Sequence, residues 1–107
     1  MIIVGCGSTG IKVAEWLMAS GAEVTMIDND SEKQRFVDNL FGSIVVLGDG
    51  TGVEIQEKAG TQRADLLIAT LNSDEDNMLA CQIAKHHFNV DTTLALSADP
   101  DLSLIHI

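Results

Sequence analysis

The sequence lacks tyrosine altogether and has a single proline and a single tryptophan among its 107 residues. Without tyrosine, the Tyr-Lys proton-transfer pair of short-chain dehydrogenases is excluded. Basic residues are scarce as well: six lysines and arginines against sixteen aspartates and glutamates give a formal charge of −10. A chain with this charge repels a phosphate backbone, so no nucleic-acid partner is expected.

Long apolar runs and paired cysteines are also missing. No run of eighteen apolar residues occurs, and Met1 opens into a strand-like run with no basic leader, so neither a membrane span nor a secretory signal is predicted. Cys6 and Cys81 are far apart and form no C-x-x-C motif, a pattern typical of a reducing cytosol. With 46% apolar residues, the length suits one domain with a substantial core.

What the sequence does contain is a glycine motif at its start. Residues 2–10 read Ile-Ile-Val-Gly-Cys-Gly-Ser-Thr-Gly, which is G-x-G-x-x-G between a strand-like and a helix-like run. Gly5 would allow a tight turn, Gly7 would let the backbone approach a pyrophosphate, and Gly10 would let the helix pack closely on the strand. The unpaired N–H groups at the helix start would then bind phosphates. Cys6, inside this loop, is either a redox sensor or simply a small residue.

A second apolar run ends at Asp28, 18 residues after Gly10. An acidic side chain at this place can accept hydrogen bonds from the hydroxyls of a ribose. The alternative is a turn or helix-capping aspartate. Asp28 is followed by Asn29, Asp30, Ser31 and Glu32, with no arginine before Arg35. A 2′-phosphate would therefore meet negative charge, and NAD is favoured over NADP. Motif and aspartate together predict a nucleotide site.

Strand-like and helix-like segments alternate five times along the chain. Strands are expected near residues 2–4, 23–27, 44–47, 66–69 and 92–96. Their continuous apolar character is typical of a parallel sheet covered on both faces. Because the dinucleotide motif follows the first strand, we predict a Rossmann-like, doubly wound α/β fold with strand order 3-2-1-4-5.

The helices between these strands are predicted from their ends. Ser31 with Gln34, and Thr51 with Glu54, predict capping boxes, and Ser73 or Asp74 is expected to cap a long fourth helix. The second helix is expected to carry its apolar residues at 36, 37, 40 and 41. Helix ends are predicted at Gly21, Gly42, Gly60 and Asn89.

The end of the chain predicts a helix rather than a strand. Asp99-Pro100 resembles an N-cap followed by proline at the first helical position, and the chain stops at Ile107, early in that helix. No sixth strand is therefore expected, and residues 1–107 are interpreted as one nucleotide-binding domain that is incomplete at its C-terminus.

Several segments resemble the RCK or KTN domains of the TrkA N-terminal type, which regulate potassium channels and transporters. The resemblance covers nearly the whole chain, and its most specific parts are the Gly-Asp-Gly-Thr and Ser-Asp-Glu-x-Asn segments. The residues that carry it are Gly5-Cys6-Gly7-Ser8-Thr9-Gly10, Val24-Thr25-Met26-Ile27-Asp28, Gly48-Asp49-Gly50-Thr51, Ala64-Asp65-Leu66-Leu67-Ile68-Ala69-Thr70, Ser73-Asp74-Glu75-Asp76-Asn77 and Ala84-Lys85.

This resemblance implies a cytoplasmic regulatory domain that binds NAD or NADH, or else ADP or ATP, and gates a potassium channel or transporter at the inner face of the membrane. It implies a homodimer or larger ring whose partner is the membrane subunit, with no membrane insertion of its own. Leu96 stands near the place where family members commonly carry an arginine, which weakens the expectation of tight triphosphate binding. The implied cofactor-binding residues are Gly5, Cys6, Gly7, Ser8, Thr9, Gly10, Asp28, Asn29, Asp49, Gly50, Thr70 and Asn72.

Other polar residues have two interpretations each. Asp49, between two glycines, is a turn residue or a pocket residue. The acidic run 74–76 either collects a divalent cation or complements the dipole of a helix. His86 and His87 are adjacent, so on a helix they point about 100° apart and are poorly placed to share a metal. Trp16 lies off the apolar stripe of the first helix and marks a subunit contact or simple edge packing.

The rival function is the cofactor-binding part of an NAD-dependent oxidoreductase. Hydride transfer also needs a substrate pocket and an acid–base group, which cofactor folds usually obtain from a second domain. The candidates His86, His87 and His106 do not lie at predicted strand ends. We therefore expect a non-catalytic sensor.

Overall fold

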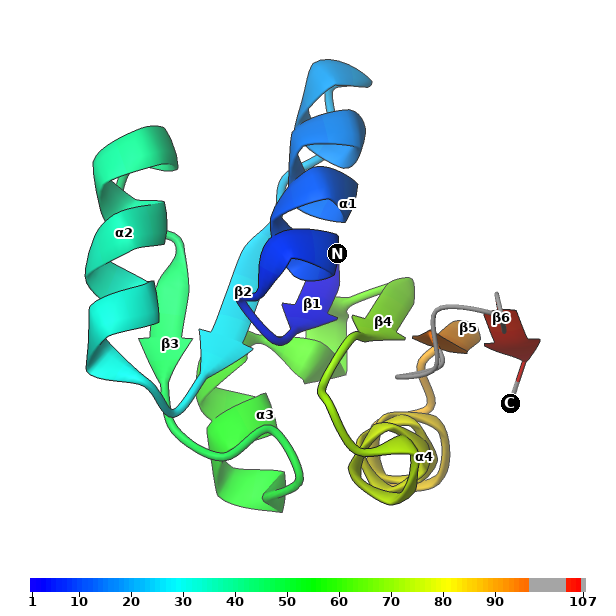
Figure 1. The fold of residues 1–107 in the computed structure, drawn as a ribbon. Helices are drawn as coiled ribbons and strands as arrows, with labels where there is room; N and C mark the ends of the chain where they lie inside the picture. The colour runs from blue at the N-terminus through cyan, green and yellow to red at the C-terminus, as the bar shows by residue number, and fades with distance from the viewer. Residues whose placement is uncertain (97–103, 107) are drawn as a thin grey trace.

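The strands are short, apolar and arranged around β1. The structure is a computed structural model and describes residues 1–96 and 104–106. Five strands pair in parallel in the order β3-β2-β1-β4-β5, which confirms the predicted doubly wound α/β fold (Figure 1). They are β1 (Ile2–Val4), β2 (Thr25–Asp28), β3 (Val45–Leu47), β4 (Leu66–Ala69) and β5 (Thr92–Leu96).

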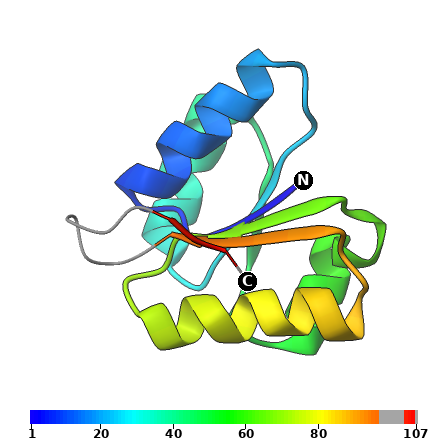
Figure 2. The same cartoon turned by 90° about the vertical axis from the view of Figure 1, so that its right-hand side faces the viewer.

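Helices cover both faces of this sheet. α1 and α2 lie on one face and α3 and α4 on the other, as the two views show (Figures 1 and 2). Successive strand residues point to opposite faces, so Ile3 packs in the core beneath α1 and α2, whereas Ile2 and Val4 pack with residues of α3 and α4. The helices are α1 (Ser8–Ala19), α2 (Ser31–Phe41), α3 (Val53–Ala59) and α4 (Asp74–Gln82), with a 3₁₀ turn at Thr61–Arg63 and a π-helical turn at Ile83–His87.

The prediction that no sixth strand is present was wrong. β6 (Leu104–His106) pairs antiparallel with β5 in the register Ala95↔Ile105. Its backbone satisfies N–H and C=O groups on an edge of β5 that would otherwise stay unpaired. Residues 104–106 therefore form a strand, not part of a fifth helix. The predicted helix start at Asp99-Pro100 lies outside the described residues.

Helix ends were predicted better than helix starts. All four predicted ends, Gly21, Gly42, Gly60 and Asn89, have positive φ, and Ser73 caps α4 through its hydroxyl oxygen. The two capping boxes were wrong. Asp30, one residue before Ser31, caps α2, because its carboxylate accepts the backbone N–H groups of Glu32 and Lys33. α3 begins after Gly52 without a side-chain cap.

The apolar face of α2 is narrower than predicted. Val37 is fully buried, but Phe36 and Leu40 are 58% and 53% exposed. Trp16 on α1 is 71% exposed, in agreement with its position off the apolar stripe. On these two helices, only the residues that face the sheet are buried.

Candidate functional site

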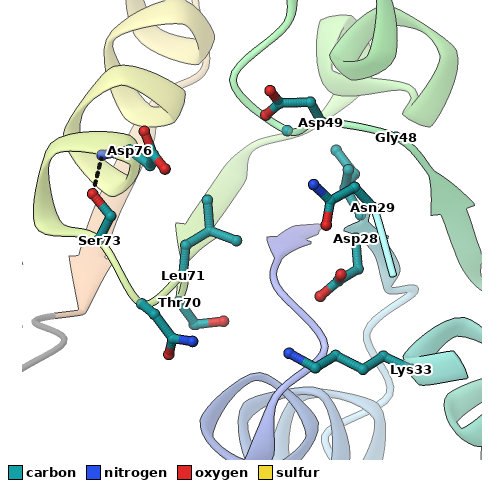
Figure 3. A pocket seen from close by; sticks show the side chains of 12 residues that line it. Asp28, Asn29, Lys33, Gly48, Asp49, Thr70, Leu71, Ser73 and Asp76 are labelled. Carbon is teal, nitrogen blue, oxygen red and sulfur yellow. Dashed lines mark hydrogen bonds between the residues drawn. The ribbon is translucent and has the colours of Figure 1, made fainter. Parts of the chain in front are cut away.

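A cleft of about 280 Å³ opens at the carboxyl ends of the parallel strands (Figure 3). One wall is the segment from β4 into α4, and the other comes from the β2–α2 and β3–α3 connections. This is the edge where doubly wound sheets bind ligands, next to the switch point between β1 and β4. The lining residues are Ile27, Asp28, Asn29, Lys33, Gly48, Asp49, Gly50, Thr70, Leu71, Asn72, Ser73 and Asp76.

Half of the residues singled out from the sequence line this cleft. They come from three different connections and are Asp28, Asn29, Asp49, Gly50, Thr70 and Asn72. The six residues of the glycine loop, numbers 5–10, do not line it. The loop contacts the cleft residues through two of its members: the Cys6 N–H donates to Asp28, and the Gly5 carbonyl accepts from the Thr70 hydroxyl.

The glycine loop is packed tightly against the start of the cleft's β4 wall. Gly5 has φ +110°, and a Cβ there would lie 2.6 Å from Oγ1 of Thr70. A Cβ on Gly10 would overlap the carbonyl oxygen of Gly5. The Thr70 hydroxyl is 2.9 Å from the carbonyl oxygen of Val4 and 3.3 Å from that of Gly5, and it donates there. Gly5 and Gly10 are therefore required by the turn and by close helix–strand packing, as predicted.

Gly7 differs from the other two glycines because no atom of the described residues beyond its chain neighbours lies within 4 Å of the place where its Cβ would be. It is the N-cap of α1, and no side chain there accepts a hydrogen bond from the helix. The first turn of α1 also contains no acidic residue. The start of this twelve-residue helix is therefore uncapped by side chains and free of acidic groups, and its positive end suits an anion.

Asp28 links the glycine loop to the end of β2. Its Oδ2 accepts the backbone N–H of Cys6 at 2.7 Å, and its Oδ1 accepts the N–H of Asp30 at 2.9 Å. The side chain is only 7% exposed, yet it lines the cleft. A carboxylate oxygen has two lone pairs, so each oxygen can accept one more hydrogen bond. Asp28 therefore organises the loop and still offers acceptors to the cleft.

The Cys6 side chain is buried in the core and does not line the cleft. It is 2% exposed and packs in the core cluster with Ile3 and Ala14. Burial, and then the nearby negative charge of Asp28, raise the pKa of this thiol to about 12. Burial raises the pKa of Cys81 to about 11. Reactive thiolates need a depressed pKa, so the redox-sensor interpretation of Cys6 has no support in its surroundings.

Asp49 is both a turn residue and a cleft residue. Its Oδ1 accepts the hydroxyl of Thr51 at 2.7 Å and the backbone N–H of Thr51 at 2.9 Å. These two hydrogen bonds, the hydroxyl one first, lower the pKa of the carboxyl. The same hydroxyl contact explains why Thr51 does not cap α3. Asp49 therefore stabilises the turn with one carboxylate oxygen and also lines the cleft, so its two interpretations do not exclude each other.

Two buried amides hold the cleft walls to α4, and sequence reasoning gave neither a role. Asn77 Oδ1 accepts the backbone N–H of Leu71 at 2.7 Å, while its Nδ2 donates to the carbonyls of Leu71 and Leu96. Gln56 Nε2 donates to the carbonyls of Gly50 and Ala80 at 2.8 and 3.0 Å. Asn77 belongs to the Ser-Asp-Glu-x-Asn segment, whose specificity could have indicated a role for this side chain. Gln56 looked like an ordinary polar residue of an amphipathic helix.

Lys33 was also missed. It lies in the first turn of α2 and lines the cleft on the same wall as Asp28 and Asn29 (Figure 3). A basic residue in the first turn of the helix that follows β2 was the signal, since that turn starts at the ligand-binding edge of the sheet.

Other candidates lie elsewhere. His86 and His87 are exposed at the end of the π-helical turn, away from the cleft lining. Among residues 1–96 and 104–106, no three side chains of His, Cys, Asp or Glu are grouped as metal ligands. The helices of this described part are all too short or too polar to span a bilayer.

The fold and the cleft together define a Rossmann-like α/β domain with its candidate site at the strand switch point. The family model of the TrkA-N domain matches residues 1–105. The chain therefore belongs to the TrkA-N domain family.

Among curated relatives, the chain is 35% identical over 101 residues to the Trk system potassium uptake protein TrkA of Vibrio alginolyticus, covering 94% of this chain and 22% of that protein. It is 33% identical over 100 residues to the TrkA homolog of Pyrococcus abyssi, covering 94% of this chain and 44% of the homolog. The chain thus spans less than half the length of either relative.

Solved structures share the fold. The TrkA-N domain of the Escherichia coli inner membrane protein ybaL superposes with a TM-score of 0.81 at 23% identity, over 90% of this chain and 70% of that one. The GsuK channel bound to NAD gives 0.78 at 19% identity, over 92% of this chain and 18% of the channel chain. An Escherichia coli anaerobilin reductase, ChuY, gives 0.64 at 15% identity, over 90% of this chain and 48% of the reductase.

Proposed function

We propose that this domain is a non-catalytic nucleotide sensor of a potassium uptake system. The observation that carries the proposal is the uncapped, acid-free start of α1 at Gly7, which lies beside a cleft that offers carboxylate, amide and hydroxyl groups. The first feature suits phosphates and the second suits a nucleoside. NAD or NADH is the preferred ligand, with ADP or ATP as the alternative, and the NAD-bound GsuK channel is a precedent on the same fold.

The binding roles follow from position. The glycine loop holds the phosphates, Asp28 and Asn29 accept the ribose hydroxyls, and Asp49 lines the nucleoside pocket with Gly50, Thr70 and Asn72. The Cys6 N–H is already donated to Asp28, so Cys6 contributes as part of the loop rather than as a separate donor. The described residues of the lining include neither histidine nor cysteine, which supports a sensor over the cofactor-binding part of an oxidoreductase.

The output is a change in how copies of the domain are arranged. The domain works as a homodimer or a larger ring at the inner face of the membrane, joined to a potassium channel or transporter subunit. A nucleotide that binds one arrangement better than another shifts the population toward it, and that shift opens or closes the pore. The relatives' names as potassium uptake proteins support this assignment.

The test is thermal unfolding of the domain with saturating NAD, NADH, NADP, ADP or ATP. A ligand at about 100 times its Kd adds roughly 2.7 kcal/mol of stability, and each kcal/mol raises the Tm by about 4–8 °C for a domain of this size. We expect a shift with NADH or an adenine nucleotide and a smaller one with NADP. If no nucleotide moves the Tm, the sensor assignment fails for this domain.

A further inference from the structure

Among the described residues that line the candidate nucleotide site, acidic side chains outnumber basic ones. Three carboxylates, those of Asp28, Asp49 and Asp76, line the cleft. The glycine loop itself contributes no basic side chain, and Leu96 on β5 is uncharged. Backbone N–H groups of α1 supply partial positive charges, and a full positive charge would further offset the repulsion between a diphosphate and these carboxylates.

Lys33 is the one basic side chain in the cleft lining among residues 1–96 and 104–106. In Figure 3 it extends from α2 into the space between the two walls, with its amine on the side of Asp28. Its charge also reaches the glycine loop, because the Lys33 ammonium acts to lower the pKa of Cys6, against the larger effect of burial. Its position in the lining and its orientation in Figure 3 thus place this amine in the cleft on the side of Asp28.

Lys33 is held at this place by the start of α2. Asp30 caps the helix and accepts the backbone N–H of Lys33 at 3.3 Å, while Asp28 accepts the N–H of Asp30. Two consecutive aspartate-to-backbone hydrogen bonds therefore fix the turn that presents the lysine. The ammonium group itself ends a flexible stem, so it can adjust to a phosphate oxygen.

We propose that Lys33 is the phosphate-binding cation of this site and that it contacts the 5′-phosphates of the nucleotide from α2. This inference rests on the proposed nucleotide site. It extends the site from the glycine loop to a second helix, and it supplies the charge that β5 lacks at Leu96. It also makes affinity depend on the number of 5′-phosphates, so the ligand class is an adenosine 5′-diphosphate or triphosphate as well as a dinucleotide.

Isothermal titration calorimetry with 5′-AMP, ADP and ATP tests this inference in the wild type and in Lys33→Met, which keeps the apolar stem. We expect Lys33→Met to weaken ADP binding about tenfold, as for the loss of a charge-assisted hydrogen bond that is partly screened by solvent, and to flatten the gain in affinity from AMP to ATP. Lys33→Arg should restore most of the affinity. Arg35→Met is the matched control on the exposed side of the same helix, and it should change affinity less than twofold.

The outcomes separate the two proposals. If the wild type binds no adenine nucleotide, the nucleotide site and the role of Lys33 both fail. If ADP binds the wild type, Lys33→Met and Arg35→Met equally well, the site stands and the role of Lys33 is rejected. A parallel titration with 2′-AMP covers the other source of phosphate: a loss confined to 2′-AMP would assign Lys33 to a 2′-phosphate and overturn the proposal. Unliganded Tm values should be the same for all variants, since Lys33 is exposed.

Discussion

At the scale of single residues, the three glycines of the loop differ in how closely they are packed. Gly5 and Gly10 are enclosed by Thr70 and by the loop's own backbone, whereas the place of a Cβ on Gly7 is empty. Gly7 also has φ −77°, which any residue adopts. The fold therefore requires two of the three glycines, and the third is left to be explained by a ligand.

Replacing Gly10 by alanine should lower the stability of the fold, whereas replacing Gly7 by alanine should impair nucleotide binding. Gly10→Ala forces a methyl group against the Gly5 carbonyl and should destabilise the fold by about 1–3 kcal/mol. Gly7→Ala should change stability by less than about 0.5 kcal/mol but abolish the thermal shift that nucleotides produce. Urea unfolding measures the first effect and ligand-dependent Tm the second. Normal nucleotide binding by Gly7→Ala would mean that phosphates do not approach this residue.

The two buried thiols predict a loss of stability at alkaline pH. Their folded-state pKa values, about 12 for Cys6 and about 11 for Cys81, lie above the ordinary value of 9.0. Below pH 9 both the folded and unfolded chains keep these protons, so the thiols add no pH dependence. Above about pH 9 the unfolded chain releases them while the folded chain does not, and the free energy of unfolding falls as the pH rises toward 11.

Urea unfolding at about pH 8 and about pH 10 measures this alkaline loss. The control is a variant with Cys6→Ala and Cys81→Ala, in which the thiol contribution is gone. Its stability should fall less between the two pH values. An equal fall in both proteins would show that the thiols titrate normally in the folded state.

At the scale of secondary-structure elements, α4 anchors both walls of the cleft. Asn77 binds the backbone of Leu71 on one wall, and Gln56 joins Gly50 on the other wall to the carbonyl of Ala80. Gln56 Oε1 is buried without a hydrogen-bond donor within the described part of the chain. Buried polar groups outside the cleft lining therefore hold its two walls in place.

Asn77→Ala should destabilise the domain by about 2–4 kcal/mol, because backbone groups of Leu71 and Leu96 lose their partners in a partly buried setting. The measurement is urea unfolding, with hydrogen exchange to locate the effect in residues 70–73. Asn39→Ala, exposed on α2, is the control and should change stability by less than about 0.5 kcal/mol. A cost for Asn77→Ala no larger than for the control would contradict the role of this amide.

Sequence reasoning succeeded where one local signal decides the structure and failed where distant groups compete. Apolar runs predicted the strands of residues 66–69 and 92–96, and glycines predicted helix ends. Thr51 was assigned to the start of α3 because its hydroxyl suits a cap, but Asp49 takes that hydroxyl. β6 could not be foreseen from Asp99-Pro100, since its pairing depends on an edge that β5 leaves open. Likewise, Lys33 lines the cleft because of the direction in which the chain enters α2, which no local sequence pattern specifies.

At the scale of the whole molecule, the formal charge of −10 is spread over a body of 32 × 32 × 26 Å. At an ionic strength of about 0.01 M the Debye length is about 30 Å, so most charges repel one another across the entire domain. At about 0.15 M the length falls to about 8 Å and only near neighbours interact. Compactness should therefore cost more at low salt.

Raising the ionic strength from about 0.01 M to about 0.15 M should stabilise the domain by about 1 kcal/mol, which corresponds to a rise in Tm of about 4–8 °C. Differential scanning calorimetry measures this. A variant with the exposed Glu15 and Glu57 changed to glutamine should respond less to salt. A Tm that is insensitive to salt would indicate that local contacts outweigh the net charge.

The central place of β1 has a consequence for how the chain is made. Within this domain β1 is synthesised before the other strands, but it pairs with β4 on one side, and the Thr70 hydroxyl that donates to the carbonyl of Val4 comes 66 residues later. At translation rates of about 5–20 residues per second, that delay is roughly 3–13 s. During it the nascent chain can assemble only β1, β2 and β3 and exposes an apolar, unpaired strand edge. The nucleotide cleft is also incomplete at this stage, because its second wall begins at Thr70. Production of the domain in cells should then depend on chaperones that bind the emerging half.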